Sequence, residues 1–487
     1  MSLHVYNTLS RRKEEFKSIH EGLVRMYVCG PTVYGHSHLG HAKSYVSFDV
    51  IVRYLRYLGY RVLYVQNITD VGHLLGDTNE GEDRVVMQSR LEQKHPMQIA
   101  EEYTRSYFED MDALNVLRPD ISPRASGHIT EQIEIVKDLV RKGFAYEANG
   151  SVYFDVRKFP GYGKLSGRSL DEMESGVRVG VKSEKRHPAD FALWKRAEPE
   201  HIMRWPSPWG VGFPGWHIEC SAMSMKYLGP TFDIHGGGLE NQFPHHECEI
   251  AQSEGSSGKP FVKYWLHNNM VTVRGGKMGK SLGNFVTLKE AFARWRPEVI
   301  RFFILQSHYR STLDFSDEAI DAAASGLARL TNTLHHLSER IGQGRPETPA
   351  PAIDLAPYKS AFLDAMNDDF NTPQAIAVLF DLSREVNAHL SRNESLDADS
   401  MRGIVALYED LGGQILGIKF REASTNQSLE DGLMKLILEL RDELRRQKLW
   451  GLSDKIRESL NGLGIVLEDK KDGSSWRKLT EGTTTDQ

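Results

Sequence analysis

Residues 26–41 read MYVCGPTVYGHSHLGH and decide the fold of the first part of the chain. The apolar run Met26–Val28 predicts a short buried strand, and the glycine- and proline-containing stretch after it predicts a turn. The segment HLGH at 38–41 then opens an amphipathic pattern that predicts a long helix. A strand, a glycine-bearing turn and a helix N-terminus together present backbone N–H groups to a phosphate. The sequence therefore predicts an anion site at this turn, with Cys29 beside it.

Two pairs of basic side chains accompany this geometry. His38 and His41 lie near the predicted helix start, where imidazole N–H groups can donate to phosphate oxygens. On the residues alone, a capping His38 and an ordinary helical His41 explain the pattern equally well. A second motif, KMGKS at 277–281, places Lys277 and Lys280 in a glycine-containing loop. Such a pair can neutralise a leaving pyrophosphate, although loop lysines are more often simply solvated.

The bulk composition is that of an ordinary soluble globular protein. The chain has 487 residues, 40% hydrophobic and 26% charged, with a formal net charge of −6. This balance gives no overall basic signature, so a nucleic-acid partner would have to bind local patches. The sequence shows no secretory leader and no apolar run long enough to span a membrane, which predicts a cytoplasmic protein with no membrane partner. Three cysteines cannot form a disulfide framework and favour metal or catalytic use.

Shifts in pattern divide the chain into six segments. They are 1–117, the first half of a nucleotide-binding α/β fold; 118–210, a connective insertion; 211–320, the second half with the lysine loop; 321–421, a helical bundle; 422–477, a small C-terminal domain; and 478–487, a tail. Within them we expect strands at 24–28 and 61–66, helical segments over about 84–115 and 130–142, and a hairpin at 145–156.

A metal site is the sharpest chemical prediction. His245 and Glu249 are four residues apart, so a helix places both on one face. With Cys29 and Cys220 they offer two thiolates, an imidazole and a carboxylate, a donor set that suits tetrahedral zinc. Cys248 lies on the same helical face and carries the softer donor. Residue chemistry alone does not choose between Cys248 and Glu249.

Longer motifs extend the pattern over nearly the whole chain. They are MYVCGPTVY at 26–34, NITD at 67–70, GWHIECSAM at 215–223, DIHGGG at 233–238 and FPHHECE at 243–249. Together with HLGH and KMGKS, the chain resembles the class I aminoacyl-tRNA synthetases, and the cysteinyl-tRNA synthetase family in particular. The resemblance implies a Rossmann-like class I synthetase catalytic domain split by an insertion, followed by an α-helical tRNA-binding bundle and a small anticodon-binding domain.

The resemblance also implies an activity. Members activate L-cysteine with ATP, which enters with Mg²⁺, and transfer cysteine from cysteinyl-adenylate to tRNA(Cys). One Zn²⁺ per subunit selects the substrate thiol, and a monomer is expected. The family's zinc carboxylate aligns with Glu249, and Cys248 falls where relatives more often have Asn. The metal ligands implied are therefore Cys29, Cys220, His245 and Glu249.

Ten positions match the family's ATP- and cysteine-binding residues. They are Gly30, Thr32, His38, Gly40, His41, Thr69, Trp216, Lys277, Lys280 and Ser281, of which the two histidines and two lysines are the expected catalytic groups. Trp216 would close the pocket around a small side chain, and a core Trp is the alternative. Thr69 would contact the amino acid, and a strand-end cap is the alternative.

Some positions depart from the family or carry weaker expectations. Gly279 stands where the lysine loop usually has Ser, and Glu240 stands where a turn facing the ammonium group usually has Asp. The candidates to stack on or pair with the anticodon loop are Trp476 and Arg477, with Arg441, Arg445, Arg446 and Lys448.

Two rival functions are a cysteine:aminosugar ligase and a non-catalytic tRNA-binding paralogue. The long helical region after residue 320 disfavours the ligase. The intact HLGH, lysine and zinc positions disfavour the paralogue.

Overall fold

The computed structural model describes residues 2–72, 83–170, 184–277, 279, 284–342, 353–391, 396–420, 425–463, 465–470 and 473–478. Two compact units, Met1–Phe420 and Arg421–Gln487, are described separately below. Within the described residues, no helix combines the length and the apolar character that crossing a bilayer requires.

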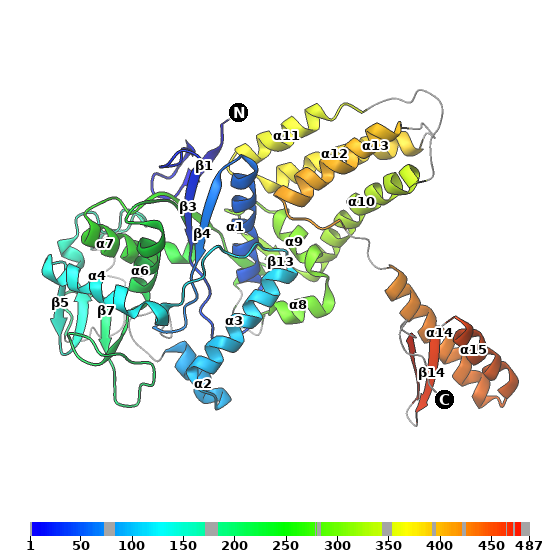
Figure 1. Cartoon of the computed structure of the whole chain (residues 1–487), viewed down its shortest axis with the longest axis horizontal. Coiled ribbons are helices and arrows are strands. Elements are labelled where there is room, and N and C mark those ends of the chain that lie inside the picture. The colour runs from blue at the N-terminus through cyan, green and yellow to red at the C-terminus, as the bar shows by residue number, and fades with distance from the viewer. Residues whose placement is uncertain are drawn as a thin grey trace. The chain divides into compact units, whose positions relative to one another are not determined.

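A four-stranded parallel sheet forms the centre of the first unit (Figure 1). In order across the sheet, its strands are β10 (Val262–Asn268), β9 (Phe232–Gly238), β3 (Leu23–Val28) and β4 (Arg61–Gln66). Strand β3 pairs with both β4 and β9, so segments far apart in the sequence share one sheet. This sheet confirms the predicted α/β fold, in which an insertion separates two halves.

Alternating side chains of β3 pack on opposite faces of the sheet. Val24, Met26 and Val28 join the apolar core that includes helix α1 (Leu39–Tyr57). Tyr27 joins a second core on the other face. Two helices cover that second face, α6 (Trp216–Leu228) and α7 (His245–Ser257), as Figure 1 shows. The side chains of β3 therefore alternate between two apolar cores, as expected for a strand that is covered on both faces.

The helical stretch expected over 84–115 is two helices, α2 (Arg84–Glu92) and α3 (Pro96–Ala113). Gln93 ends α2 in the left-handed region, with a φ of 53°. His95 caps α3, whose first residue is a proline. The expectation of one continuous pattern missed this break because apolar periodicity persists across it, whereas proline at the first helical position marks a new start.

The predicted insertion forms a small antiparallel sheet beside helix α4 (Ile129–Arg141). Its strands are β5 (Ala145–Ala148), β6 (Ser151–Phe154), β7 (Phe191–Arg196) and β8 (Gly212–Pro214), and short 3₁₀ turns lie at Ala125–His128 and Val156–Lys158. Strands β5 and β6 are the hairpin expected at 145–156. Strand β8 extends this sheet past residue 210 and leads directly into α6.

Short elements complete the α/β part of the first unit. They are β1 (His4–Asn7), β2 (Arg12–Glu15), η4 (Leu239–Gln242), β11 (Val271–Val273), β12 (Gly276–Lys277), α8 (Leu288–Arg294), α9 (Pro297–Leu305) and β13 (Leu313–Phe315). Strands β12, β11 and β13 form one sheet in that order. The lysine loop therefore leaves directly from a sheet strand.

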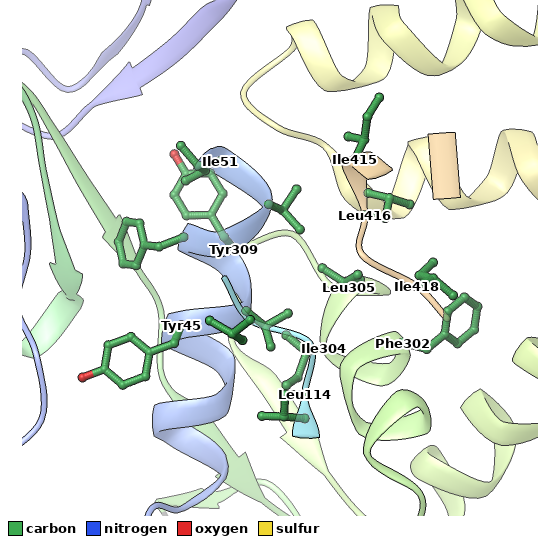
Figure 2. Close-up of a cluster of buried hydrophobic side chains, with 14 of the residues drawn as sticks. Tyr45, Ile51, Leu114, Phe302, Ile304, Leu305, Tyr309, Ile415, Leu416 and Ile418 are labelled. Atoms are coloured by element: carbon green, nitrogen blue, oxygen red, sulfur yellow. The ribbon is translucent and has the colours of Figure 1, made fainter. Parts of the chain in front are cut away.

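A helical region follows in the first unit. It contains α10 (Asp317–Gly342), α11 (Ala356–Asn367), α12 (Thr372–Ser391), α13 (Ala398–Tyr408) and a π-helical turn, η6 (Glu409–Ile415). Figure 2 shows the end of this region beside α9, where Leu416 and Ile418 share an apolar core with Phe302 and Leu305. The sequence also predicts a proline-rich linker over residues 344–357, most of which lies outside the described residues.

A buried ion pair lies in the same junction. The Arg301 guanidinium of α9 contacts the Asp49 carboxylate of α1, and both side chains are almost fully buried. Arg301 also donates to the carbonyls of Leu416, at 2.9 Å, and Leu114, at 3.0 Å. Arg53 donates to Asp49 at 2.8 Å. The pair thus ties the helix that starts at HLGH to the helical region.

The second unit is a small α/β unit. Its elements are α14 (Thr425–Arg446), α15 (Trp450–Gly462), β14 (Ile465–Lys470) and β15 (Gly473–Lys478), with the two strands antiparallel. Met434, Leu460 and Leu467 form its core, and Trp476 packs against them. Arg441 is buried, with 2% of its surface exposed. The expectation that Arg441 contacts an anticodon loop is therefore wrong, because α14 turns it inward.

Candidate active site

Four predicted ligands meet at the carboxyl end of the central sheet. Cys29 follows β3, Cys220 lies on α6, and His245 and Glu249 lie on α7. One donor atom from each lies within 4.8 Å of all the others. Cys29 is half-buried and the other three are buried. The fold thus assembles residues that the sequence separates by more than two hundred positions.

Cys248, the alternative ligand, belongs to a different environment. Its Sγ lies 3.3 Å from the hydroxyl of Tyr162. Glu249 lies in both donor groups found among the described residues, and Cys248 lies in neither. The geometry therefore favours Glu249 over Cys248, although both lie on one helix.

Histidines surround the four donors. His235 Nε2 lies 2.9 Å from Glu249 Oε2, and His246 Nε2 lies 3.2 Å from Cys29 Sγ. With Cys29 and Glu249, these two histidines make a second, overlapping donor group. His246 Nδ1 in turn lies 2.8 Å from His267 Nε2. The sequence motifs contain His235, but nothing in its pattern indicated that it supports Glu249.

The donors are electrostatically coupled. Burial raises the pKa of Glu249, but the opposing effects of His235 and His245 are larger and hold it at about 2. Burial lowers the pKa of His245, but the negative charges of Glu249 and Cys220 have a larger effect and raise that pKa to about 10. A hydrogen bond with Cys29 lowers the pKa of Cys220, whereas burial raises that of Cys29. The cluster therefore favours an ionised Glu249 carboxylate and a Cys220 thiolate beside a positively charged His245. A bound metal ion can replace the proton of His245 as the positive charge.

The HLGH turn combines capping with donor presentation. His38 caps α1: its Nδ1 accepts from the Gly40 N–H at 3.1 Å, and His41 Nδ1 accepts from the His38 N–H at 3.4 Å. The capping interpretation of His38 therefore holds. It also has a chemical consequence, because a neutral imidazole that accepts at Nδ1 carries its proton on Nε2. Burial lowers the pKa of His41 to about 4, so His41 is neutral near pH 7.

A pocket of about 440 Å³ joins the turn to the donor cluster. The predicted residues on its wall are Cys29, Gly30, Thr32, His38, Gly40, His41, Thr69, Trp216, Cys220 and His245. Further lining residues that the sequence did not indicate include Tyr34, Asn67, Arg84, Asn241, Asn268 and Phe285. Glu249 lies deeper and is fully buried.

One wall of the pocket depends on a glycine. A Cβ on Gly30 would lie 1.5 Å from the Asn67 carbonyl oxygen, so no larger residue fits there. The Asn67 side chain accepts from the Gly30 N–H at 2.8 Å and donates to Thr69 Oγ1 at 3.0 Å. Thr32 and Thr69 form an isolated parallel bridge. Asn67 thus holds the two strand ends together.

Trp216 and Glu240 occupy separate parts of the rim. The Trp216 ring centroid lies 4.3 Å from that of His245, so the indole covers the donor cluster. Glu240 also lines the pocket and is exposed.

The lysine loop is only partly described. The backbone of Lys277 pairs with Thr272 in β12. Lys280 and Ser281 lie outside the described residues, as does the side chain of Lys277. After the loop, the N–H of Leu288 donates to the Ser37 carbonyl at 2.8 Å. This bond attaches the loop's C-terminal end to the HLGH turn.

The comparisons with known proteins agree with this geometry. The family described as tRNA synthetases class I (C) catalytic domain matches residues 15–325, and the DALR domain family matches residues 361–421. A curated Cysteine--tRNA ligase of Chlorobaculum tepidum is 57% identical over 98% of this chain and 99% of its own length. The Cysteine--tRNA ligase of Deinococcus radiodurans is 52% identical over 98% of this chain and 97% of its own.

A solved structure shares the fold at low identity. The methionyl-tRNA synthetase of Mycobacterium tuberculosis, in complex with methionyl-adenylate, matches with a TM-score of 0.56 and 15% identity. The match covers 81% of this chain and 93% of that one. Taken with the identity to the curated relatives, these matches show that the chain belongs to the cysteine–tRNA ligase family of class I tRNA synthetases, enzymes that use ATP and tRNA as substrates.

Proposed function

We propose that this protein joins L-cysteine to tRNA(Cys) in two steps at the pocket described above. The cysteine carboxylate attacks the α-phosphate of ATP, giving cysteinyl-adenylate and pyrophosphate. The terminal adenosine hydroxyl of the tRNA then attacks the adenylate carbonyl and releases AMP. One observation carries the proposal: a thiol-rich donor cluster lies on the wall of the pocket that the HLGH turn also lines. We further propose a cytoplasmic monomer.

The donor cluster fits one zinc ion per subunit by its chemistry. Cys29, Cys220, His245 and Glu249 offer sulfur, nitrogen and oxygen donors close together, and this mixture suits zinc better than harder ions. When bound, zinc supplies a soft acceptor for the thiolate of substrate cysteine. An apolar pocket would separate cysteine from serine by only about 1–3 kcal/mol. Trp216 excludes water from the cluster and limits the size of the side chain that enters.

The HLGH turn orients ATP. His38 and His41 donate from Nε2 to phosphate oxygens, a direction favoured because Nδ1 of each already accepts from the backbone. Gly30, Thr32 and Gly40 leave room for the substrates along the turn, and Thr69 contacts the amino acid. A carboxylate nucleophile needs no general base, so these groups act by positioning and electrostatics.

The lysine loop stabilises the leaving group. We propose that Lys277 and Lys280 offset charge on pyrophosphate in the transition state, with Ser281 as a hydroxyl contact and Mg²⁺ bound to the phosphates of ATP. Gly279 in place of the usual serine removes one hydroxyl and keeps both charges.

The regions outside the pocket would hold the tRNA. We propose that 321–421 contacts the body of the tRNA and that 422–477 contacts its anticodon loop, while 118–210 is a connective insertion without editing activity. The curated relatives match over 98% of the chain, C-terminal regions included, which supports tRNA rather than an aminosugar as the acceptor. Intact HLGH and zinc positions disfavour a non-catalytic paralogue.

The test uses full-length protein loaded with zinc. We expect cysteine to be attached to a tRNA(Cys) transcript and not to an aminosugar, and about one zinc per chain. Glu249→Ala should lose zinc and charging, whereas the matched Cys248→Ser should keep both. Aminosugar ligation without tRNA charging would replace the proposal with the ligase, and loss of zinc in Cys248→Ser alone would replace the ligand set.

A further inference from the structure

The turn between α11 and α12 combines a strained backbone with a buried carboxylate. Asp369 and Phe370 both lie in the left-handed region, with φ of 62° and 55°. Residues other than glycine rarely adopt that region, and Asn and Asp tolerate it better than most. The Asp369 side chain is fully buried, and the Phe370 ring packs edge to face on Tyr54 of α1. Such strain persists only where surrounding contacts fix the conformation, so the partners of Asp369 indicate the role of the turn.

The Asp369 carboxylate binds the segment that follows helix α9. The Tyr309 hydroxyl donates to Oδ1 at 2.8 Å, and Arg310 Nε donates to Oδ2 at 2.7 Å. The Tyr6 N–H of β1 also donates to Oδ1, at 2.8 Å. His308 Nε2 lies 3.0 Å from the Asp369 carbonyl oxygen. Asp369 thus contacts three consecutive residues of the segment, and the buried Tyr309 ring packs in the core shared with α1 (Figure 2).

The same segment holds one wall of the pocket through its backbone carbonyls. The Asn269 N–H donates to the Tyr309 carbonyl at 2.9 Å, and Asn269 Nδ2 donates to the Arg310 carbonyl at 3.1 Å. Asn269 lines the pocket, and so does Met270 after it. The residues that bind the Asp369 carboxylate are therefore the residues that hold this wall.

Helix α1 holds the wall from another direction. Lys43 Nζ donates to the Met270 carbonyl at 3.2 Å, and Ser44 Oγ donates to Asn268 Oδ1 at 3.0 Å. Lys43 and Ser44 lie near the start of the helix that begins at HLGH, the proposed phosphate site. Residues 268–271 of the wall are Asn, Asn, Met and Val, which carry no charge. Amide and apolar groups beside a phosphate site suit the base of a nucleotide better than the charged groups of an amino acid.

We propose that Asp369 is a positioning residue for ATP. Through Tyr309 and Arg310 it holds the wall at 269–270 at the distance from the HLGH turn that the nucleotide requires. Asp369 belongs to the helical region, within the part that matches the DALR domain family. ATP binding in the pocket therefore depends on a residue outside the α/β part of the unit. The inference rests on the proposed function, because it assumes that ATP lies against this wall.

The test is cysteine-dependent ATP–pyrophosphate exchange by zinc-loaded full-length protein. Asp369→Gly removes the carboxylate and relieves the left-handed strain. Its kcat/KM for ATP should fall about 10- to 100-fold, since a displacement of about 1 Å can cost that much. The KM for cysteine and the bound zinc should stay as in the wild type. Asp369→Asn tolerates the left-handed conformation and keeps an acceptor for the Tyr309 hydroxyl, so it should recover part of the loss.

Two further variants separate positioning from folding. The matched control is Asp190→Gly, the same change at another buried carboxylate, which accepts from the Tyr146 hydroxyl at 2.7 Å and the Val156 N–H at 3.1 Å. Neither partner is among the described residues that line the pocket. The control should lower the melting temperature and leave kcat/KM for ATP as in the wild type. Tyr309→Phe keeps the ring and removes only the hydroxyl, so it should fold and lower kcat/KM for ATP to a smaller extent.

The outcomes are distinguishable. Wild-type kcat/KM for ATP in folded Asp369→Gly, or in Tyr309→Phe if only that variant folds, would leave Asp369 with a purely structural role and overturn the inference. Equal losses for ATP and cysteine would also overturn it, because the whole pocket would then be disturbed. Absence of exchange in the wild-type protein would instead overturn the proposed function itself.

Discussion

Removing the hydrogen bond from His235 should weaken zinc binding without removing a ligand. His235 Nε2 lies 2.9 Å from Glu249 Oε2, and both side chains are fully buried. In His235→Phe the ring can keep its stacking on Trp265, at 4.6 Å between centroids, but Glu249 loses its hydrogen-bond partner at Oε2. A hydrogen bond to a charged group contributes about 1.5–3 kcal/mol. The expected loss of zinc affinity is therefore about 10- to 150-fold.

The assay is competition for zinc against a chromogenic chelator at fixed pH. The matched control is His128→Gln, which removes another buried imidazole; its Nδ1 lies 2.7 Å from the Arg124 carbonyl oxygen and its Nε2 lies 2.8 Å from the Tyr227 hydroxyl. We expect the control to bind zinc as the wild type does. Thermal melting verifies that both variants fold. Wild-type affinity in a folded His235→Phe would refute the argument that this histidine supports Glu249.

Three further predictions concern stability and ATP binding. Arg301→Met leaves the buried Asp49 short of its partner and should lower the free energy of unfolding by about 3–5 kcal/mol, measured by urea denaturation; a loss below 1 kcal/mol would contradict it. Burial lowers the pKa of His41 to about 4, so between about pH 6.5 and 4 the unfolded chain binds the proton that the native state excludes. Unfolding free energy should therefore fall with decreasing pH, by up to about 1.4 kcal/mol per pH unit from this group, and His41→Asn should reduce that slope; an unchanged slope would refute the assignment. Lys43 Nζ donates at 3.2 Å to the carbonyl of Met270, a residue of the pocket wall. Lys43→Met should raise the KM for ATP in the exchange assay, and Lys43→Arg should raise it less. An equal rise in both variants would argue against a role for the hydrogen bond.

Much of the central fold could be predicted because its strands carry local signals. The predicted strands at 24–28 and 61–66 coincide with β3 and β4, since a strand covered on both faces is rich in apolar residues. The break between α2 and α3 was missed because only Pro96 and the conformation of Gln93 mark it. Burial of Arg441 was missed because an arginine on an amphipathic helix gives no sign of what covers it.

The candidate site could be predicted only where its chemistry is unusual. Two cysteines, a histidine and a glutamate stand out against ordinary composition, and the structure brings all four together. The sequence could not decide between Cys248 and Glu249, since both lie within one turn of His245. Only the structure shows that Cys248 Sγ lies 3.3 Å from the hydroxyl of Tyr162, a residue 86 positions away in the sequence.

Supporting residues were harder to anticipate. Asn67 and His235 act through contacts made by other strands and helices, at 2.8 Å to the Gly30 N–H and 2.9 Å to Glu249. Arg84 lines the pocket at the start of α2, where it donates to the Tyr34 hydroxyl at 2.9 Å. Such contacts join segments that are distant in the sequence, so residue type and spacing do not predict them.

The most direct test of the account is cysteine-dependent ATP–pyrophosphate exchange by the wild-type protein, compared with serine and compared before and after zinc removal. The account predicts exchange with cysteine in the zinc-loaded enzyme and at least about 1,000-fold weaker exchange with serine, beyond the roughly 200-fold that an apolar pocket can achieve. It also predicts that exchange is lost on zinc removal and returns when zinc is restored. Equal exchange with serine, or full cysteine activation by zinc-free protein, would contradict the central claim that a metal held by Cys29, Cys220, His245 and Glu249 selects the substrate thiol.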